Sequence, residues 1–191
     1  GGHDQRLEVP AGGVSHDHPR RGRDGPAATA GGVTLGAVTT YLVRHASAGM
    51  RDDADQSDEQ RPLDDTGIVQ ASKLTSWLRH EPIDTIVSSP YLRCRQTVEP
   101  LAAALGLEVT VSDALAEGTP IKKSWELLAS VASRTAVLCS HGDVIPDLIR
   151  RAQLRGMHVP GKSGSAKGSV WTLQHWEDDT FATGIYTPIP R

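Results

Sequence analysis

The chain has 191 residues, a net charge of −3 and two cysteines, a length that suits one domain of ordinary size and a tail. Its hydrophobic content of 38% supports a globular core, but no apolar run approaches the roughly 20 residues of a membrane span. A slightly acidic chain also lacks the broad basic face of a nucleic-acid binder. With neither a secretory signal nor a disulfide framework expected, we predict a cytoplasmic protein that binds no nucleic acid and no membrane.

Residues 1–37 are predicted to form a flexible tail, part of which can be a cloning remnant. This stretch holds nine of the 19 glycines, three prolines and no aromatic residue, so it buries too little apolar surface to offset the entropy of ordering. Its histidines, His3, His16 and His18, are expected to be solvated, because no second set of ligands follows them at a fixed spacing. No metal and no other cofactor is expected.

From residue 38 onward, β-rich runs alternate with stretches of helical period. This alternation predicts an α/β fold, a three-layer sandwich with a mainly parallel central sheet and helices on both faces. Asp143 is expected to cap the fourth helix. The buried side of the first helix is expected to comprise Ile68, Ala71, Leu74 and Leu78. The predicted strands are 38–43, 83–88, 108–111 and 136–139, with a closing hairpin of 169–175 and 180–186, and the predicted helices are 66–80, 91–105, 122–133 and 144–154.

Basic and nucleophilic side chains follow three of the predicted strands. Arg44 and His45 come at the end of the first strand, Arg93 comes shortly after the second, and His141 and Gly142 follow the fourth. Sites in parallel sheets form beyond the carboxyl ends of the strands, so we expect these residues to lie together.

The residue types suit phosphoryl transfer, which needs a nucleophile, cations for the phosphate oxygens and an acid for the leaving group. His45 offers a neutral imidazole nitrogen, and its other nitrogen is expected to bond a backbone carbonyl. Arg44 and Arg93 offer guanidinium forks that match phosphate oxygens. A protonated His141 would add a further cation, and the backbone N–H of Gly142, at a helix start, a further donor.

The candidate acid is Glu117, in a loop after the short third strand. A single loop glutamate is usually solvated, and a single histidine is usually structural. Five compatible residues at the ends of consecutive elements make a functional site the better interpretation.

Three segments carry a resemblance to a known family: 42–46 (Leu-Val-Arg-His-Ala), 88–97 (Ser-Ser-Pro-Tyr-Leu-Arg-Cys-Arg-Gln-Thr) and 140–142 (Ser-His-Gly). Together and in this order they resemble the histidine phosphatase (phosphoglycerate mutase-like) superfamily. The resemblance covers about residues 38–191, which are therefore expected to form a histidine phosphatase domain. The family's usual Arg-His-Gly triplet reads Arg-His-Ala here.

This resemblance implies a nucleophile, His45, that becomes phosphohistidine, and a proton donor, Glu117. Ser47 is the nearby hydroxyl expected to contact phosphate. The resulting assignment is catalytic for His45, Glu117 and His141, and phosphate-binding for Arg44, Arg93, His141, Gly142 and Ser47.

Two finer resemblances concern the substrate. Arg93, Glu117 and His141 are each 24 residues apart. These intervals are too short to contain the insertion that covers the site in the mutases. Residues 61–67 also look like the corresponding stretch of the SixA-type phosphohistidine phosphatases. Residues 94–102, 143–146 and 167–169 instead resemble the phosphatase domain fused to MutT-type Nudix hydrolases of actinobacteria.

The sequence therefore predicts a metal-independent phosphohydrolase, a SixA-like phosphatase of a phosphorylated histidine phosphotransfer protein. A phosphatase of nucleotides or other small phosphomonoesters is the alternative, and a non-catalytic phosphate-binding module is the alternative of another class. The physiological substrate and the oligomeric state stay open.

Two cysteines could suggest a different phosphatase chemistry. Cysteine-dependent phosphatases need an arginine six positions after the cysteine, but the residue six positions after Cys139 is Ile145. Cys94 and Cys139 are therefore expected to be core residues.

Overall fold

The fold is seen in a computed structural model that describes residues 38–50 and 58–189. The predicted tail 1–37, with its three histidines, and part of the polar loop after His45 lie outside the described residues. Within these ranges, six strands form one sheet in the order β3-β2-β4-β1-β5-β6. The strands are β1 (Thr39–Arg44), β2 (Thr85–Ser88), β3 (Val109–Val111), β4 (Ala136–Ser140), β5 (Val170–Glu177) and β6 (Thr180–Thr187).

The sheet is mainly parallel, as predicted. Strands β1, β2, β3 and β4 run parallel to one another, whereas β5 pairs antiparallel with β1 and β6 pairs antiparallel with β5. The predicted hairpin is thus confirmed. Asp178 and Asp179 make its turn, both with positive φ values, 49° and 58°, as a two-residue hairpin turn requires.

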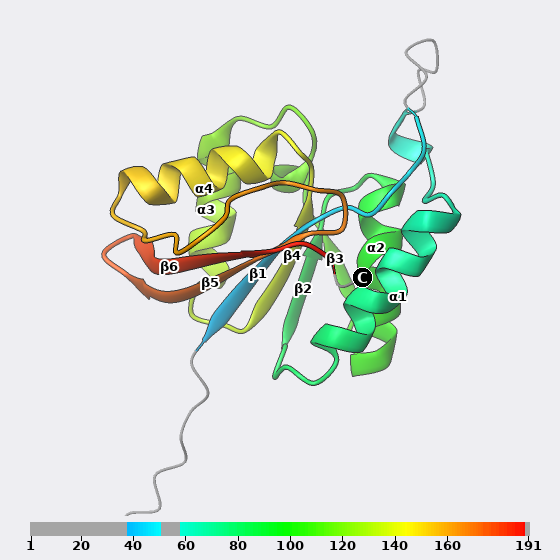
Figure 1. The fold of residues 1–191 in the computed structure, drawn as a ribbon, viewed down its shortest axis with the longest axis horizontal. Coiled ribbons are helices and arrows are strands. Elements are labelled where there is room, and N and C mark those ends of the chain that lie inside the picture. Colours follow the sequence, from blue (N-terminus) through cyan, green and yellow to red (C-terminus); the bar gives the residue numbers. More distant parts are fainter. Residues whose placement is uncertain (1–37, 51–57, 190–191) are drawn as a thin grey trace, which may run out of the picture. The chain divides into compact units, whose positions relative to one another are not determined.

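Four helices cover the two faces of this sheet (Figure 1): α1 (Asp65–Leu78), α2 (Leu92–Leu105), α3 (Ile121–Val131) and α4 (Val144–Leu154). Successive residues of β1 point to opposite faces. Tyr41 and Val43 pack in the cluster that includes α1 and α2, and Leu42 packs in the cluster that includes α3 and α4. The predicted three-layer sandwich is confirmed.

The buried side of α1 differs from the prediction at one position. Ile68, expected in the core, is 59% exposed, whereas Gly67, Ala71, Leu74 and Leu78 are buried. Gly67 faces the backbone of Ser47 so closely that a Cβ atom there would lie 1.9 Å from the carbonyl oxygen of Ser47. This contact sets the rotation of the helix and turns Ile68 toward solvent.

The predicted capping role of Asp143 is wrong. Its backbone is helical, with φ −92° and ψ −45°, and its side chain makes no capping hydrogen bond to α4. An N-cap residue needs an extended backbone to bring its side chain over the first turn. The Asp143 carboxylate instead accepts a hydrogen bond from the backbone N–H of Gly118 at 2.7 Å.

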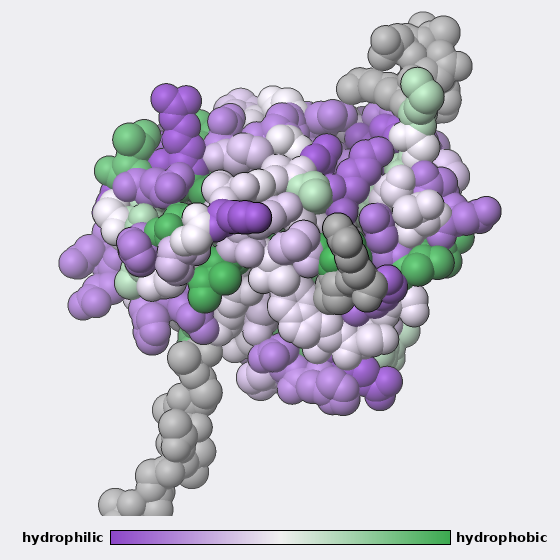
Figure 2. Space-filling model, viewed as in Figure 1, coloured by the Kyte–Doolittle hydropathy of each residue, from purple (hydrophilic) through white to green (hydrophobic). Residues whose placement is uncertain are grey.

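Both cysteines are core residues, as predicted. Cys94 and Cys139 are fully buried and free, and burial raises the pKa of the Cys139 thiol well above its usual value. Hydrophobic residues on the face seen in Figure 2 form small separate patches among polar ones. In the described part of the chain, no helix is both long and apolar enough to cross a membrane.

Candidate active site

The two histidines of the predicted site are neighbours because β1 and β4 are neighbours. Arg44 pairs in register with Ser140, and the N–H of His45 donates to the carbonyl of Ser140 at 3.0 Å. His45 and His141 therefore leave the sheet side by side at its carboxyl edge. Their ring centroids lie 5.4 Å apart in an edge-to-face arrangement, and both side chains are buried.

His45 is held as a neutral imidazole with one nitrogen available. Its Nδ1 lies 2.8 Å from the carbonyl oxygen of Ala46; since a carbonyl only accepts, Nδ1 carries the proton and Nε2 keeps its lone pair. Burial lowers the pKa of His45 from 6.5 to about 4; the hydrogen bond to Ala46 opposes this shift, and the cations Arg93, Arg44 and Lys167 add to it. A neutral imidazole with a fixed tautomer is the state that a nucleophile needs.

Arg93 is buried at the start of α2, with a relative exposure of 1%, between two acidic side chains. Its Nη1 donates to the carbonyl oxygen of Asp58 at 2.8 Å and lies 3.1 Å from the Asp58 carboxylate. Its Nη2 donates to the Glu117 carboxylate at 3.1 Å. Its Nε has no hydrogen-bond partner among the described residues.

Arg44 shows the same pattern at the end of β1. Its Nη1 donates to the carbonyl oxygen of Ser165, and its buried Nε also has no partner among the residues described. In a guanidinium, Nε–H and Nη2 lie along one edge, and such an edge binds two oxygens of one oxyanion. Buried donors are normally paired, and the Nε groups of Arg44 and Arg93, which have no partner among the described residues, are therefore available to an anion.

Gly142 makes room for this arrangement. A Cβ atom at position 142 would lie 2.6 Å from the guanidinium carbon of Arg44. The absence of a side chain therefore lets Arg44 lie against the backbone just before α4. Donation of the Gly142 N–H to a phosphate stays a prediction.

His141 is buried against two polar neighbours, Ser89 and Arg93. Its Nε2 lies 2.8 Å from the hydroxyl of Ser89, and Arg93 Nη2 lies 3.4 Å from its Nδ1. Because arginine only donates, Nδ1 accepts and the proton resides on Nε2. Burial, followed by the charge of Arg93, lowers the pKa of His141 to about 3. With protein groups alone around it His141 is neutral near pH 7, and the predicted third cation would require a nearby dianion to raise that pKa.

Glu117 is brought to the site by a loop that is anchored on both sides. The carbonyl of Leu115 accepts from the hydroxyl of Ser140 at 2.7 Å, and Gly118 donates to Asp143. Glu117 itself is 32% exposed and contacts Arg93. The predicted acid therefore lies at the guanidinium that is expected to hold the phosphate, with a path to solvent.

Ser47, predicted to contact phosphate, has its polar groups engaged elsewhere. Its hydroxyl donates to Asp64 at 2.7 Å, and its N–H donates to the side chain of Gln70 at 2.8 Å. Asp64 also accepts from Gly67 in the first turn of α1. Ser47 thus ties the loop after His45 to the start of α1, and a contact between its hydroxyl and a phosphate stays a prediction.

Sequence reasoning missed several residues that hold the site together. Thr97 accepts from the N–H of Ala46 at 3.0 Å and donates to the carbonyl of Arg93 at 2.7 Å. The ring of Tyr91 lies 4.7 Å from that of His141, and Arg93 stacks over it at 4.5 Å. Ser89, Tyr91 and Thr97 all fall within the motif 88–97, which was the available signal. No sequence signal singled out Asp58, because it lies in a polar loop that contains several other acidic residues.

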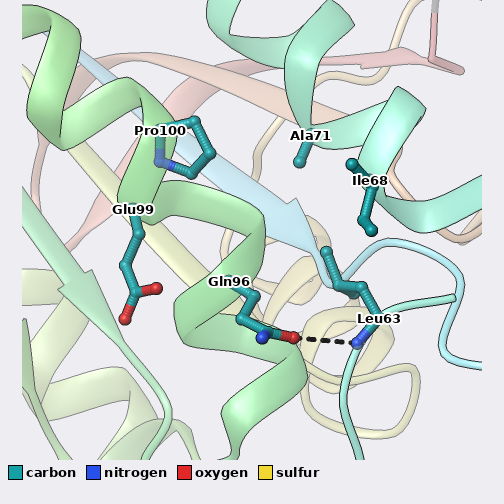
Figure 3. Close-up of a pocket in the computed structure, with 6 residues that line it drawn as sticks. All are labelled: Leu63, Ile68, Ala71, Gln96, Glu99 and Pro100. Atoms are coloured by element: carbon teal, nitrogen blue, oxygen red, sulfur yellow. Dashed lines mark hydrogen bonds between the residues drawn. The ribbon is translucent and has the colours of Figure 1, made fainter. Parts of the chain in front are cut away.

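A cavity of about 280 Å³ lies between α1 and α2 (Figure 3). The predicted site residues are not among those that line it. Its wall includes the hydrogen bond from the N–H of Leu63 to the side chain of Gln96, at 2.9 Å. This bond fixes the segment before α1 onto α2, one turn beyond Arg93. Within the described ranges, no three His, Cys, Asp or Glu side chains gather as a metal site would need.

Comparison with known proteins places the chain. The sequence profile of the histidine phosphatase superfamily (branch 1) matches residues 40–119. A structure from Nakamurella multipartitia, named for the phosphohistidine phosphatase SixA, is 30% identical with a TM-score of 0.59, over 82% of this chain and 96% of that one. The chain belongs to the histidine phosphatase superfamily. The predicted family and its hydrolytic phosphatase class are thereby confirmed.

Other members of the superfamily share the fold or part of the sequence. The structure of the protein histidine phosphatase SixA complexed with tungstate matches with a TM-score of 0.59 at 20% identity, over 78% of this chain and 94% of that one. An 8-oxo-(d)GTP phosphatase of Mycolicibacterium smegmatis is 35% identical over 155 residues, which are 78% of this chain and 48% of that protein. The chain thus spans about half the length of this curated relative.

Proposed function

We propose that this histidine phosphatase hydrolyses its substrate through a phosphohistidine formed on His45. The observation that carries the proposal is the hydrogen bond from His45 Nδ1 to the Ala46 carbonyl, which leaves Nε2 as a buried, unprotonated nucleophile. The Nε groups of Arg44 and Arg93, which have no partner in the described part of the chain, support a phosphoryl group bound beside it.

The reaction then has two steps. In the first, the lone pair of His45 Nε2 attacks phosphorus, the bond to the leaving group breaks, and Glu117 gives that group a proton. In the second, water attacks the phosphohistidine, Glu117 takes its proton, and inorganic phosphate leaves with His45 regenerated. Arg44 and Arg93 stabilise the charge on the phosphoryl oxygens throughout. His141 joins them once the nearby dianion raises its pKa and it takes up a proton from solvent.

The substrate we favour is a phosphohistidine on a partner protein. Support comes from the similarity to the Nakamurella structure named for SixA, which extends over 96% of that chain, and from the short segments that separate Arg93, Glu117 and His141. An imidazole leaving group also needs less protonation by an acid than an alkoxide leaving group does. Loss of Glu117 would therefore lower turnover less for a phosphohistidine substrate than for an alkyl phosphate.

A second candidate is a nucleotide. It is favoured by the 35% identity to the 8-oxo-(d)GTP phosphatase. The deciding assay compares release of phosphate from a phosphorylated histidine phosphotransfer protein and from a panel of nucleoside di- and triphosphates that includes 8-oxo-dGTP. The preferred substrate class is the one with the higher kcat/KM.

The mechanism is tested by trapping the phosphoenzyme. Wild type, His45→Ala and the control His158→Ala, an exposed histidine outside the motifs, are mixed with ³²P-labelled substrate and denatured in alkali, which preserves phosphohistidine. We expect label on wild type and on the control, and neither label nor turnover with His45→Ala. An unlabelled wild type that turns over, or full turnover by His45→Ala, would refute the mechanism.

A further inference from the structure

Asp58 contacts Arg93 through both its backbone oxygen and its carboxylate, although no catalytic role falls to it. We propose that Asp58 is a positioning residue that fixes the rotation of the Arg93 guanidinium and so aims its Nε–Nη2 edge at the phosphoryl group. The proposal rests on the phosphate-binding role of Arg93 proposed above, and it adds a residue on which the binding of that phosphate depends.

The contacts of Asp58 converge on one nitrogen of Arg93. Nη1 donates to the Asp58 backbone oxygen at 2.8 Å and lies 3.1 Å from the carboxylate Oδ2. The backbone oxygen of Asp58 thus holds this nitrogen by a hydrogen bond, and its carboxylate lies within ion-pair distance of the same nitrogen. Since Arg93 is almost completely buried, water cannot substitute for these acceptors.

Asp58 is itself held in place. Its Oδ1 accepts from Arg61 Nε at 2.8 Å, and Arg61 Nη1 donates to the carbonyl of Ala48 at 2.6 Å. Further along the same segment, Leu63 is bonded to Gln96 on α2 (Figure 3). The segment 58–63 is therefore attached to α2 at two points and to the loop after His45 at a third.

This anchoring decides which edge of Arg93 is available. With Nη1 occupied by Asp58, the donors left are Nε, which has no partner among the described residues, and Nη2, which contacts Glu117 and the Nδ1 of His141. These two donors share the edge that can bind two oxygens of one phosphoryl group. Without Asp58, Arg93 could turn its Nη1–Nη2 edge to Glu117, and both the phosphate site and the acid would be misplaced.

The positioning role and a simple charge effect predict changes of opposite sign in oxyanion affinity when Asp58 is neutralised. If Asp58 acted only as a negative charge competing with phosphate, then neutralising it would tighten the binding of an oxyanion. If Asp58 orients Arg93, then the same change weakens binding, because the two-point geometry is lost. The sign of the change therefore distinguishes the two explanations.

The test is oxyanion affinity in Asp58→Asn, a substitution that keeps the shape and removes the charge. The control is Asp84→Asn, which removes the carboxylate of an exposed ion pair with Arg134 at 3.0 Å. Binding of inorganic phosphate and of orthovanadate is measured by calorimetry and as competitive inhibition of p-nitrophenyl phosphate turnover. We expect Asp58→Asn to lose about 10- to 100-fold in oxyanion affinity, the contribution of one hydrogen bond to a charged group, and Asp84→Asn to match wild type.

A double-mutant cycle separates this role from support of the fold. If Asp58 acts through Arg93, then Asp58→Asn should cause no further loss of oxyanion affinity in an Arg93→Ala background. Arg61→Gln, which loosens Asp58 without altering it, should weaken binding in the same direction, and thermal midpoints show whether each variant is folded.

Unchanged or tighter oxyanion binding by folded Asp58→Asn, or full additivity with Arg93→Ala, overturns the proposal. If the wild type hydrolyses substrate through labelled His45 but Asp58→Asn binds vanadate normally, then the proposed function stands. Only the positioning role of Asp58 is then refuted. A wild type that binds neither phosphate nor vanadate overturns both.

Discussion

His45 and His141 are the same kind of side chain, and their hydrogen bonds make them different. The Nδ1–H of His45 donates to the Ala46 carbonyl and leaves Nε2 unprotonated, whereas the Nε2–H of His141 donates to Ser89 and its Nδ1 faces Arg93. Both have lowered pKa values, about 4 and about 3, chiefly because they are buried. Each is therefore neutral over most of the pH range in which the protein would work.

The lowered pKa of His45 predicts an unusual pH profile. The nucleophile is active when unprotonated, so kcat/KM, corrected for ionisation of the substrate, should stay level from pH 7.5 through 6.5 and fall only as pH approaches about 4. Stopped assays over this range, with brief exposure to acid, would measure it. A fall centred near 6.5, the value of an unperturbed histidine, would mean that His45 is not held neutral.

The loss of kcat/KM on removing the acid Glu117 should grow with the basicity of the leaving group. Glu117→Gln should lower kcat/KM by about 100-fold or more for an alkyl phosphate, within the range for general acids. It should have a much smaller effect for p-nitrophenyl phosphate, whose leaving group needs little protonation. A Brønsted series of phosphomonoesters would measure this dependence. Equal losses across the series would contradict the role of an acid.

At the scale of elements, two glycines allow close packing at the two ends of the site. Gly67, in α1, faces the carbonyl of Ser47, and Gly142, before α4, faces the guanidinium of Arg44. The obstacle at Gly67 is rigid backbone, whereas at Gly142 it is the end of a flexible side chain. The same substitution should therefore affect stability at one position and activity at the other.

Gly67→Ala should destabilise the fold by about 1–3 kcal/mol or more, as overpacked sites do, because α1 must move away from the loop after His45. The measurement is the free energy of unfolding in urea, with Ser72→Ala on the exposed side of α1 as the control. A stability equal to that of wild type would show that the contact relaxes without cost.

Gly142→Ala should instead lower activity while leaving the unfolding free energy within about 1 kcal/mol of wild type, because Arg44 can swing away from the new methyl group. The readout is phosphate or vanadate affinity together with kcat/KM. An active variant with normal oxyanion affinity would mean that Arg44 does not need its present position.

At the scale of the whole molecule, the buried neutral histidines couple folding to pH. In the unfolded chain they bind protons with a pKa near 6.5, whereas in the folded protein the values are about 4 and about 3. Between pH 6.5 and 4 the unfolded chain therefore binds more protons, so the free energy of unfolding rises with pH in this window. The stability contributed by these groups is present above pH 6.5 and is lost as pH falls.

This coupling predicts a measurable slope. Each histidine should contribute up to about 1.4 kcal/mol per pH unit within the window. Urea unfolding at a series of pH values should thus give a flatter dependence for His141→Gln than for wild type. The exposed His158→Gln should keep the wild-type slope. Equal slopes for all three proteins would contradict buried, neutral histidines.

Much of the fold was predictable because it follows from local patterns. Buried strands and amphipathic helices have distinct periods, so the order of elements and the mainly parallel sheet could be derived. Ile68 and Asp143 were misjudged because their environments depend on distant backbone. The carbonyl of Ser47 sets the rotation of α1, and the N–H of Gly118 takes the Asp143 carboxylate.

The sequence by itself determined the family, the α/β layering and the residues at the strand ends, because motif order and residue type are properties of the chain. Only the tertiary structure decided which nitrogen of each histidine is protonated, that the hydroxyl of Ser47 donates to Asp64, and that Asp58 contacts Arg93. These features depend on hydrogen bonds between segments that are far apart in the sequence. Partners of that kind carry no local pattern, so the folded chain alone reveals them.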